Sequence, residues 1–162
     1  MARRAFFSFH YERDVWRAGQ VRNSWVTQDR ESAGFWDSAS WEEVKKKGND
    51  AIQKWIDDQL KGTSVTVVLI GTETSERTYV GYEIKQSYNK GNGMLGIYIH
   101  NMKDVNSKTD TKGNNPFDNW YIERNGSKVY FSTLYPTYDW VNDDGRNKMG
   151  DWIEAAAKKA GK

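Results

Sequence analysis

The 162-residue sequence contains no cysteine and only two prolines, two histidines and four leucines. The absence of cysteine excludes disulfides, cysteine-ligated zinc and thiol catalysis. The histidines, His10 and His100, form no His-x-x-x-His pair, so a metal site would need carboxylates gathered from distant positions. We therefore expect neither a bound metal ion nor a resident cofactor.

Long apolar runs and a strong bias of charge are also missing. The apolar run near the start ends at Ser8 and His10, too short for a signal peptide, and no run of about 18 apolar residues follows. The 24 basic and 22 acidic residues give a net charge of +2, without the basic excess of a nucleic-acid-binding protein. We expect a cytoplasmic protein that binds neither membranes nor nucleic acids.

Aromatic residues are abundant, with eight Trp, nine Tyr and six Phe. This amount of apolar surface excludes a disordered chain, and the rings must fill core volume that leucine usually fills. The length predicts a single domain over residues 1–162. Within it we expect an irregular insertion and a hairpin over about 102–136 and a last helix over about 144–160.

Buried strands are predicted from apolar, β-branched runs. Residues 64–71 are almost continuously apolar, which is typical of a central strand in a parallel sheet. Residues 4–9 and 94–100 have a similar character, and residues 34–37 predict a very short second strand. Periodic apolar residues between these runs predict helices over about 15–25, 49–61 and 77–89.

The alternation of strands and helices predicts an α/β fold with a doubly wound, mainly parallel sheet flanked by helices. We expect Asp14 to cap the first of these helices. The residues expected to face the core from the first and third helices are Val15, Ala18, Val21 and Trp25, and Val80, Ile84 and Tyr88. Residues 120–124 and 127–131, joined by Asn125-Gly126, predict a β-hairpin.

Familiar catalytic and nucleotide-binding motifs do not fit. Residues 91–96 match Gly-x-Gly-x-x-Gly, but they lie between a predicted helix and the next strand, whereas the dinucleotide fingerprint follows a strand and opens a helix. No Walker A motif and no Gly-x-Ser-x-Gly nucleophile elbow occurs. A receiver domain would need clustered acidic residues after the first strand, where Phe9 and His10 stand instead.

Polar side chains are expected to gather beyond the carboxyl ends of the strands, where open parallel sheets bind ligands. His10 follows the first predicted strand and Asp37 follows the second. Each has a structural alternative: His10 could stabilise a turn, and Asp37 could cap the turn at 38–40.

Glu83 lies near the start of the helix that follows the central strand. It is adjacent to Val80 and Ile84, which are expected to face the core, so its carboxylate is expected to point towards the same rim. The alternative is an ordinary solvated glutamate on a helix surface.

The sequence resembles a known family at several places. Residues 6–11 and 65–71 look like the first and central strands of a TIR domain, and residues 79–84 resemble its aromatic-x-x-x-Glu signature. An ordered set of segments is similar to the TIR-like ThsB proteins of bacterial Thoeris antiphage defence: residues 7–10, 21–25, 64–66, 82–84, 115–118 and 138–141. The resemblance spans nearly the whole chain.

This resemblance implies a flavodoxin-like TIR fold and an enzyme that acts on NAD⁺. It implies cleavage of the nicotinamide–ribose bond and formation of a cyclic ADP-ribose isomer. It also implies the partners: a phage-derived trigger, a separate nucleotide-sensing effector that the product activates, and a homo-oligomer. The alternative, from a different functional class, is a non-catalytic TIR-type module that acts through protein contacts.

Residue by residue, the resemblance assigns the catalytic glutamate to Glu83. Tyr79 takes the aromatic position four residues before it, where the family usually has tryptophan. Phe9 and His10 fall at the end of the first strand beside the nucleotide pocket, and residues 35–41, including Trp36 and Asp37, fall in a loop over that pocket.

The expected chemistry suits these residue types. Nicotinamide leaves with its positive charge already in place, so no strong general acid is needed, and one carboxylate can stabilise the charge that develops on the ribose. The rings of Phe9, Trp36 and Tyr79 could stack on nicotinamide or adenine. The alternative for each ring is plain packing in the core.

Overall fold

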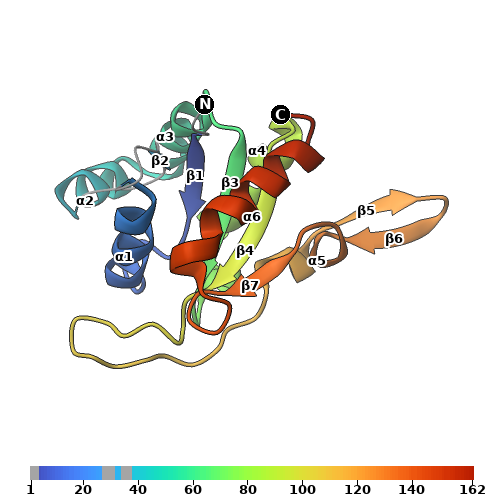
Figure 1. Ribbon diagram of the computed structural model, residues 1–162. Helices are drawn as coiled ribbons and strands as arrows, with labels where there is room; N and C mark the ends of the chain where they lie inside the picture. The colour runs from blue at the N-terminus through green and yellow to red at the C-terminus, as the bar shows by residue number, and fades with distance from the viewer. Residues whose placement is uncertain (1–3, 27–31, 34–37) are drawn as a thin grey trace.

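The structure, a computed structural model, describes residues 4–26, 32–33 and 38–162 (Figure 1). Five parallel strands form its main sheet in the order β2-β1-β3-β4-β7. The strands are β1 (Ala5–Ser8), β2 (Ser32–Ala33), β3 (Val65–Ile70), β4 (Gly93–Tyr98) and β7 (Thr137–Asp139). This is the 2-1-3-4-5 order of flavodoxin-like sheets, and it confirms the predicted fold class.

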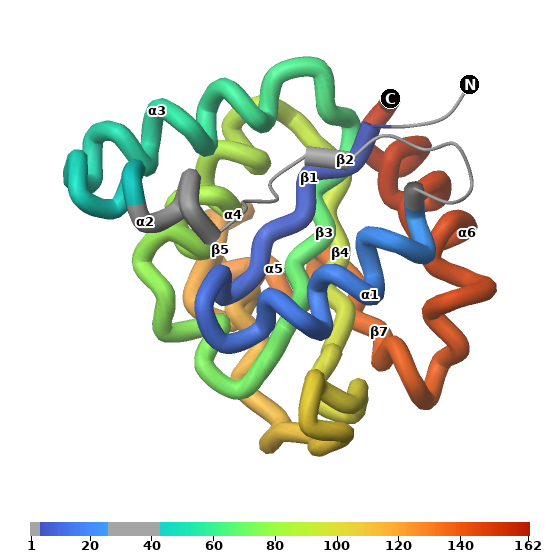
Figure 2. Tube along the Cα trace, turned by 90° about the vertical axis from the view of Figure 1, so that its left-hand side faces the viewer, coloured from blue at the N-terminus to red at the C-terminus, as the bar shows by residue number. Residues whose placement is uncertain are grey.

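Helices cover both faces of this sheet, as the side view shows (Figure 2). On one face lie α1 (Val15–Val26) and α6 (Gly145–Lys159), and on the other lie α3 (Asn49–Leu60) and α4 (Thr78–Lys90). Helix α2 (Ser38–Lys47) precedes α3 and packs against it. None of the helices in the described ranges has both the length and the apolar character needed to cross a membrane.

The central strand divides the core into two sides. All six residues of β3 are buried, and they alternate between the two helical layers because successive strand residues point to opposite faces. Val65, Val67 and Leu69 pack with α1 and α6, whereas Val68 and Ile70 pack with α4. The prediction of a strand covered on both faces is therefore confirmed.

The hairpin predicted around Asn125-Gly126 is present. Strands β5 (Tyr121–Arg124) and β6 (Ser127–Tyr130) pair antiparallel, and they extend away from the main sheet (Figure 1). Asn125 and Gly126 have φ angles of 54° and 78°, the left-handed conformation that a two-residue hairpin turn requires. A one-turn helix, α5 (Phe131–Leu134), follows β6 and buries Phe131.

Residues 99–115, all of them described, form no helix or strand. Two arginines attach this loop to the body of the protein: Arg13, which precedes α1, and Arg17, in the first turn of α1. Arg13 donates two hydrogen bonds of 2.9 Å to the carboxylate of Asp110, and buried Arg17 donates to the carbonyls of Met102 and Lys108 at 2.8 and 2.9 Å. The irregular segment is thereby held over the carboxyl ends of the strands.

Two details of the sequence-based prediction were wrong: the cap at Asp14 and the core-facing positions of Val15 and Tyr88. Asp14 does not cap α1, because its carboxylate is buried against Gly71 and accepts no hydrogen bond from the described residues. Val15 and Tyr88 do not face the core, since 46% and 40% of their surface is exposed. Strand β2 lies at Ser32–Ala33, and the predicted strand at 34–37 falls outside the described residues.

Candidate active site

Two segments meet at the carboxyl edge of the sheet. Ser8 ends β1 and Tyr11 follows it by three residues, while Tyr79 and Glu83 lie one turn apart on α4. Helix α4 packs against β1, so the side chains of the two segments face each other. The parallel arrangement brings them together, because the carboxyl ends of all strands lie at one edge.

Glu83 lies at the centre of this cluster and is fully buried. The hydroxyls of Ser8 and Tyr11 donate hydrogen bonds of 2.7 Å to its two carboxylate oxygens. Burial raises the pKa of Glu83 to about 8, although the two hydroxyl bonds act in the opposite direction. Burial therefore favours the protonated carboxyl group of Glu83 in this conformation. The solvated alternative for this residue is excluded, and its carboxyl group lies below the rim rather than on it.

Tyr11 closes the space above the glutamate. Its ring stacks on that of Tyr79, with centroids 4.8 Å apart and planes 8° apart, and its backbone N–H donates to the Tyr79 hydroxyl at 3.0 Å. The ring of Trp55 meets Tyr11 edge-on at 6.1 Å. Burial raises the pKa of the Tyr79 hydroxyl, which therefore stays protonated at all physiological pH values. The aromatic pair separates Glu83 from solvent.

His10 is placed as a turn residue. Its Nδ1 accepts the backbone N–H groups of Glu12 and Arg13 at 3.3 and 3.2 Å, which requires the neutral imidazole with its proton on Nε2. Nε2 lies 3.8 Å from the carboxylate of Glu73. Burial, aided by the charge of Arg77, lowers the pKa of His10 and favours the same neutral form.

The other predicted site residues do not join the cluster around Glu83 in the described part of the chain. Phe9 is 1% exposed and lies in the main core, with its ring edge-on to Tyr11 at 4.9 Å. Trp36 and Asp37 lie outside the described residues. The structure thus brings together Tyr79 and Glu83, places His10 in the adjoining turn, and buries Phe9 in the core.

Ser8 and Tyr11 are contacts of Glu83 that the sequence analysis missed. The alternation along β1 offered a signal for Ser8, because Phe7 and Phe9 share one face and a polar residue between them must point at the other helical layer. Tyr11 follows the strand in an irregular turn, where no periodicity predicts the direction of a side chain.

A second buried carboxyl group lies on the same edge. Burial raises the pKa of Asp14 to about 6, and the guanidinium of Arg17, 3.8 Å away, acts in the opposite direction. The hydrogen bonds from Arg13, in contrast, hold the pKa of Asp110 well below its usual range. In the described part of the chain, no three His, Cys, Asp or Glu side chains lie close enough to hold a metal ion.

Known proteins are similar to this chain over most of its length. Residues 6–104 match the family model described as "Thoeris protein ThsB, TIR-like domain". The chain belongs to the ThsB TIR-like family. It is also similar to a Bacillus cereus (strain MSX-D12) protein named "Putative cyclic ADP-D-ribose synthase ThsB1", with 36% identity covering 94% of this chain and all of that protein.

The resemblance noted from the sequence is thus confirmed. The span matched by the ThsB model contains every residue of the cluster around Glu83: Ser8, Tyr11, Tyr79 and Glu83 itself. The hairpin, β7 and α6 lie beyond that span, but the similarity to the Bacillus protein covers nearly the whole chain. The ThsB match therefore applies directly to the part of the fold that carries the candidate site.

Proposed function

We propose that this ThsB-type protein cleaves the nicotinamide–ribose bond of NAD⁺ and forms a cyclic ADP-ribose-type signal, with Glu83 as the catalytic carboxylate. The observation that carries the proposal is a buried, hydrogen-bonded glutamate at the carboxyl edge of a TIR-like sheet, with its pKa strongly raised. Such perturbed groups occur preferentially at functional sites. The name of the Bacillus relative supports the same reaction.

The proposed reaction breaks the bond between C1′ of the ribose and the nicotinamide nitrogen, and the bonding electrons leave with neutral nicotinamide. A nucleophilic atom elsewhere in the same ADP-ribosyl unit then forms a bond to C1′ and loses its proton. The products are nicotinamide, a cyclic isomer of ADP-ribose and one proton. An ionised Glu83 stabilises the positive charge that develops on the ribose.

The described conformation is closed to this chemistry. Glu83 has no solvent exposure, and Tyr11 occupies the position from which a substrate would approach its Oε2 atom. Separation of Tyr11 from Tyr79 admits NAD⁺ and water together. Hydration then lowers the pKa of Glu83 towards its ordinary value near 4.5, so the opened site contains the carboxylate that the reaction needs.

The proposal includes the partners expected from the resemblance. A phage-derived trigger, acting on a homo-oligomer, opens the site, and the product activates a separate nucleotide-sensing effector. The protein acts in the cytoplasm and needs no resident cofactor. Because the resting protein is closed at Glu83, it is expected to be slow or silent without the trigger.

Prolonged incubation with NAD⁺, with and without phage-infected cell extract, tests this function. Free nicotinamide and a cyclised ADP-ribose in equal amounts, identified by chromatography and mass spectrometry, are expected. A reaction with NAD⁺ and extract but without the protein is the control, and it measures the background consumption of NAD⁺. If neither product forms under triggering conditions while the protein remains folded, the protein is a non-catalytic module that acts through protein contacts.

A further inference from the structure

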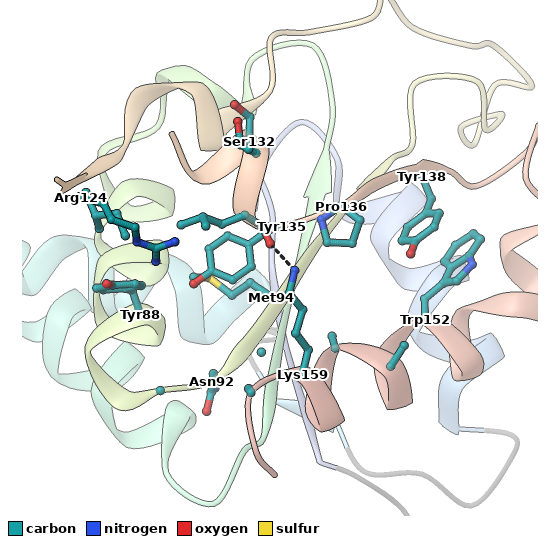
Figure 3. Close-up of a pocket in the computed structure, with 18 residues that line it drawn as sticks. Tyr88, Asn92, Met94, Arg124, Ser132, Tyr135, Pro136, Tyr138, Trp152 and Lys159 are labelled. Carbon is teal, nitrogen blue, oxygen red and sulfur yellow. Dashed lines mark hydrogen bonds between the residues drawn. The ribbon is translucent and has the colours of Figure 1, made fainter. Parts of the chain in front are cut away.

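A pocket of about 520 Å³ lies beside the amino end of β4 (Figure 3). It adjoins Gly93 and Met94 at the amino end of β4, whereas Glu83 contacts the carboxyl end of β1. The short β7 pairs only with Gly96–Tyr98 and leaves the first half of β4 without a strand on that side. The end of α4, the hairpin, α5 and α6 surround the resulting space.

Aromatic rings form much of the pocket wall. They are Tyr88, Tyr135, Tyr138 and Trp152, from α4, the segment after α5, β7 and α6. Tyr138 and Trp152 are stacked with centroids 4.0 Å apart, which fixes both rings (Figure 3). Tyr88, which was expected to face the core but is partly exposed, lines this pocket. Rings arranged in this way offer flat apolar surfaces to a planar ligand.

The two charged residues that line the pocket are both cations. Arg124 extends from β5, and no ion pair or hydrogen bond of its side chain occurs with the described residues. Lys159 of α6 donates one hydrogen bond, of 2.9 Å, to the carbonyl of Leu134 (Figure 3). A lysine has three donors, so two remain for a ligand.

We propose that this pocket binds a small planar aromatic molecule that carries a phosphate or a similar anionic group, of about the size of a mononucleotide. The volume lies within the range of small-molecule sites, and a wall of rings with few polar groups is typical of them. Arg124 and Lys159 supply the charge-assisted hydrogen bonds for the anion. The site is separate from Glu83 and does not depend on the proposed reaction.

Isothermal titration calorimetry of the whole protein with AMP tests the proposal, with adenosine as the neutral counterpart. We expect AMP to bind with a Kd of about 1 mM or tighter, and adenosine at least about tenfold more weakly. The variant Arg124→Gln/Lys159→Gln should lose at least about tenfold in AMP affinity, because both anion contacts are removed. Both side chains are largely exposed, so the folded state should tolerate the changes.

Matched controls separate this site from general charge and from Glu83. Lys128→Gln/Lys158→Gln removes the same charge from the same hairpin and helix, outside the pocket lining, and should change the Kd by less than about twofold. A loss of AMP affinity in Arg124→Gln/Lys159→Gln that the control pair does not show places the ligand in this pocket and not beside Glu83. Absence of saturable AMP binding, equal affinity for adenosine, or equal losses in the two double variants would each overturn the proposal.

Discussion

Replacement of Glu83 by glutamine should stabilise the protein, and the gain should grow with pH. Glutamine has nearly the volume of glutamate and can still bond to Ser8 and Tyr11, but it never ionises. The pKa of Glu83 is about 8 in the folded protein, compared with an ordinary value of 4.5. A carboxyl group with a raised folded pKa contributes stability that is complete below pH 4.5 and is lost as the pH rises through about 8.

The size of the effect follows from these two pKa values. Relative to a group that does not titrate, ionisation of Glu83 costs about 2 kcal/mol of folding free energy at pH 6 and about 3 kcal/mol at pH 7. The cost levels off near 5 kcal/mol, in order of magnitude, well above pH 8. Asp14 and His10 also titrate differently in the folded state, but both are present in wild type and variant, so their contributions cancel in the difference.

Urea denaturation of wild type and Glu83→Gln at several pH values between 4.5 and 8.5 measures this difference directly. The imperfect fit of an amide between two hydroxyls adds a constant offset, so the test is the slope with pH rather than the value at one pH. Glu76→Gln, at an exposed position, is the matched control and should show no slope. A pH-independent difference for Glu83→Gln would refute the reasoning, since it would mean that Glu83 is ionised in the folded protein.

Three further predictions concern the surroundings of the site. His10→Ala should lower the melting temperature by several degrees, because two backbone N–H groups lose their acceptor at a cost of about 1–2 kcal/mol, while activity per folded molecule persists. Lost activity with an unchanged melting temperature would instead place His10 in the nucleotide site. Asp110→Asn should loosen the part of the 99–115 loop that Arg13 holds and speed its cleavage in limited proteolysis, with less than about 1 kcal/mol lost in global stability. Unchanged cleavage would show that Arg13 does not hold the loop. Gly71→Ala should destabilise the folded protein by about 2–3 kcal/mol, because its Cβ would overlap the Asp14 carboxylate, and adding Asp14→Ala should recover part of that loss. If the two changes in free energy of unfolding simply add in urea denaturation, the contact is contradicted.

Much of the architecture could be predicted from local patterns. Five of the six residues of the strand Val65–Ile70 are apolar, Thr66 being the exception, and such a run is stable only between two layers of helices. Asn125-Gly126 specifies a hairpin turn through its backbone preference alone. These features depend on neighbouring residues in the sequence, and for that reason they were predicted correctly.

The closed state of the site depended on contacts between distant residues and could not be predicted. Glu83 was correctly placed on the inward side of α4, but its hydroxyl partners lie 72 and 75 positions away in the sequence. The cap predicted at Asp14 failed for a similar reason: the close approach of Gly71 gives that side chain a buried position that local capping rules do not consider. The pocket near Lys159 likewise arises from the short length of β7, which no sequence pattern indicated.

The central claim is that Glu83 is the carboxylate that promotes loss of nicotinamide from NAD⁺. The most direct measurement is the rate of nicotinamide release by wild type, Glu83→Gln and Glu76→Gln under the same triggering conditions, with folded protein quantified in each sample. The account predicts that Glu83→Gln is about 10²–10³-fold slower than wild type, a loss of roughly 3–4 kcal/mol of transition-state stabilisation, while Glu76→Gln is unchanged. A Glu83→Gln protein that keeps most of the wild-type rate would contradict the claim.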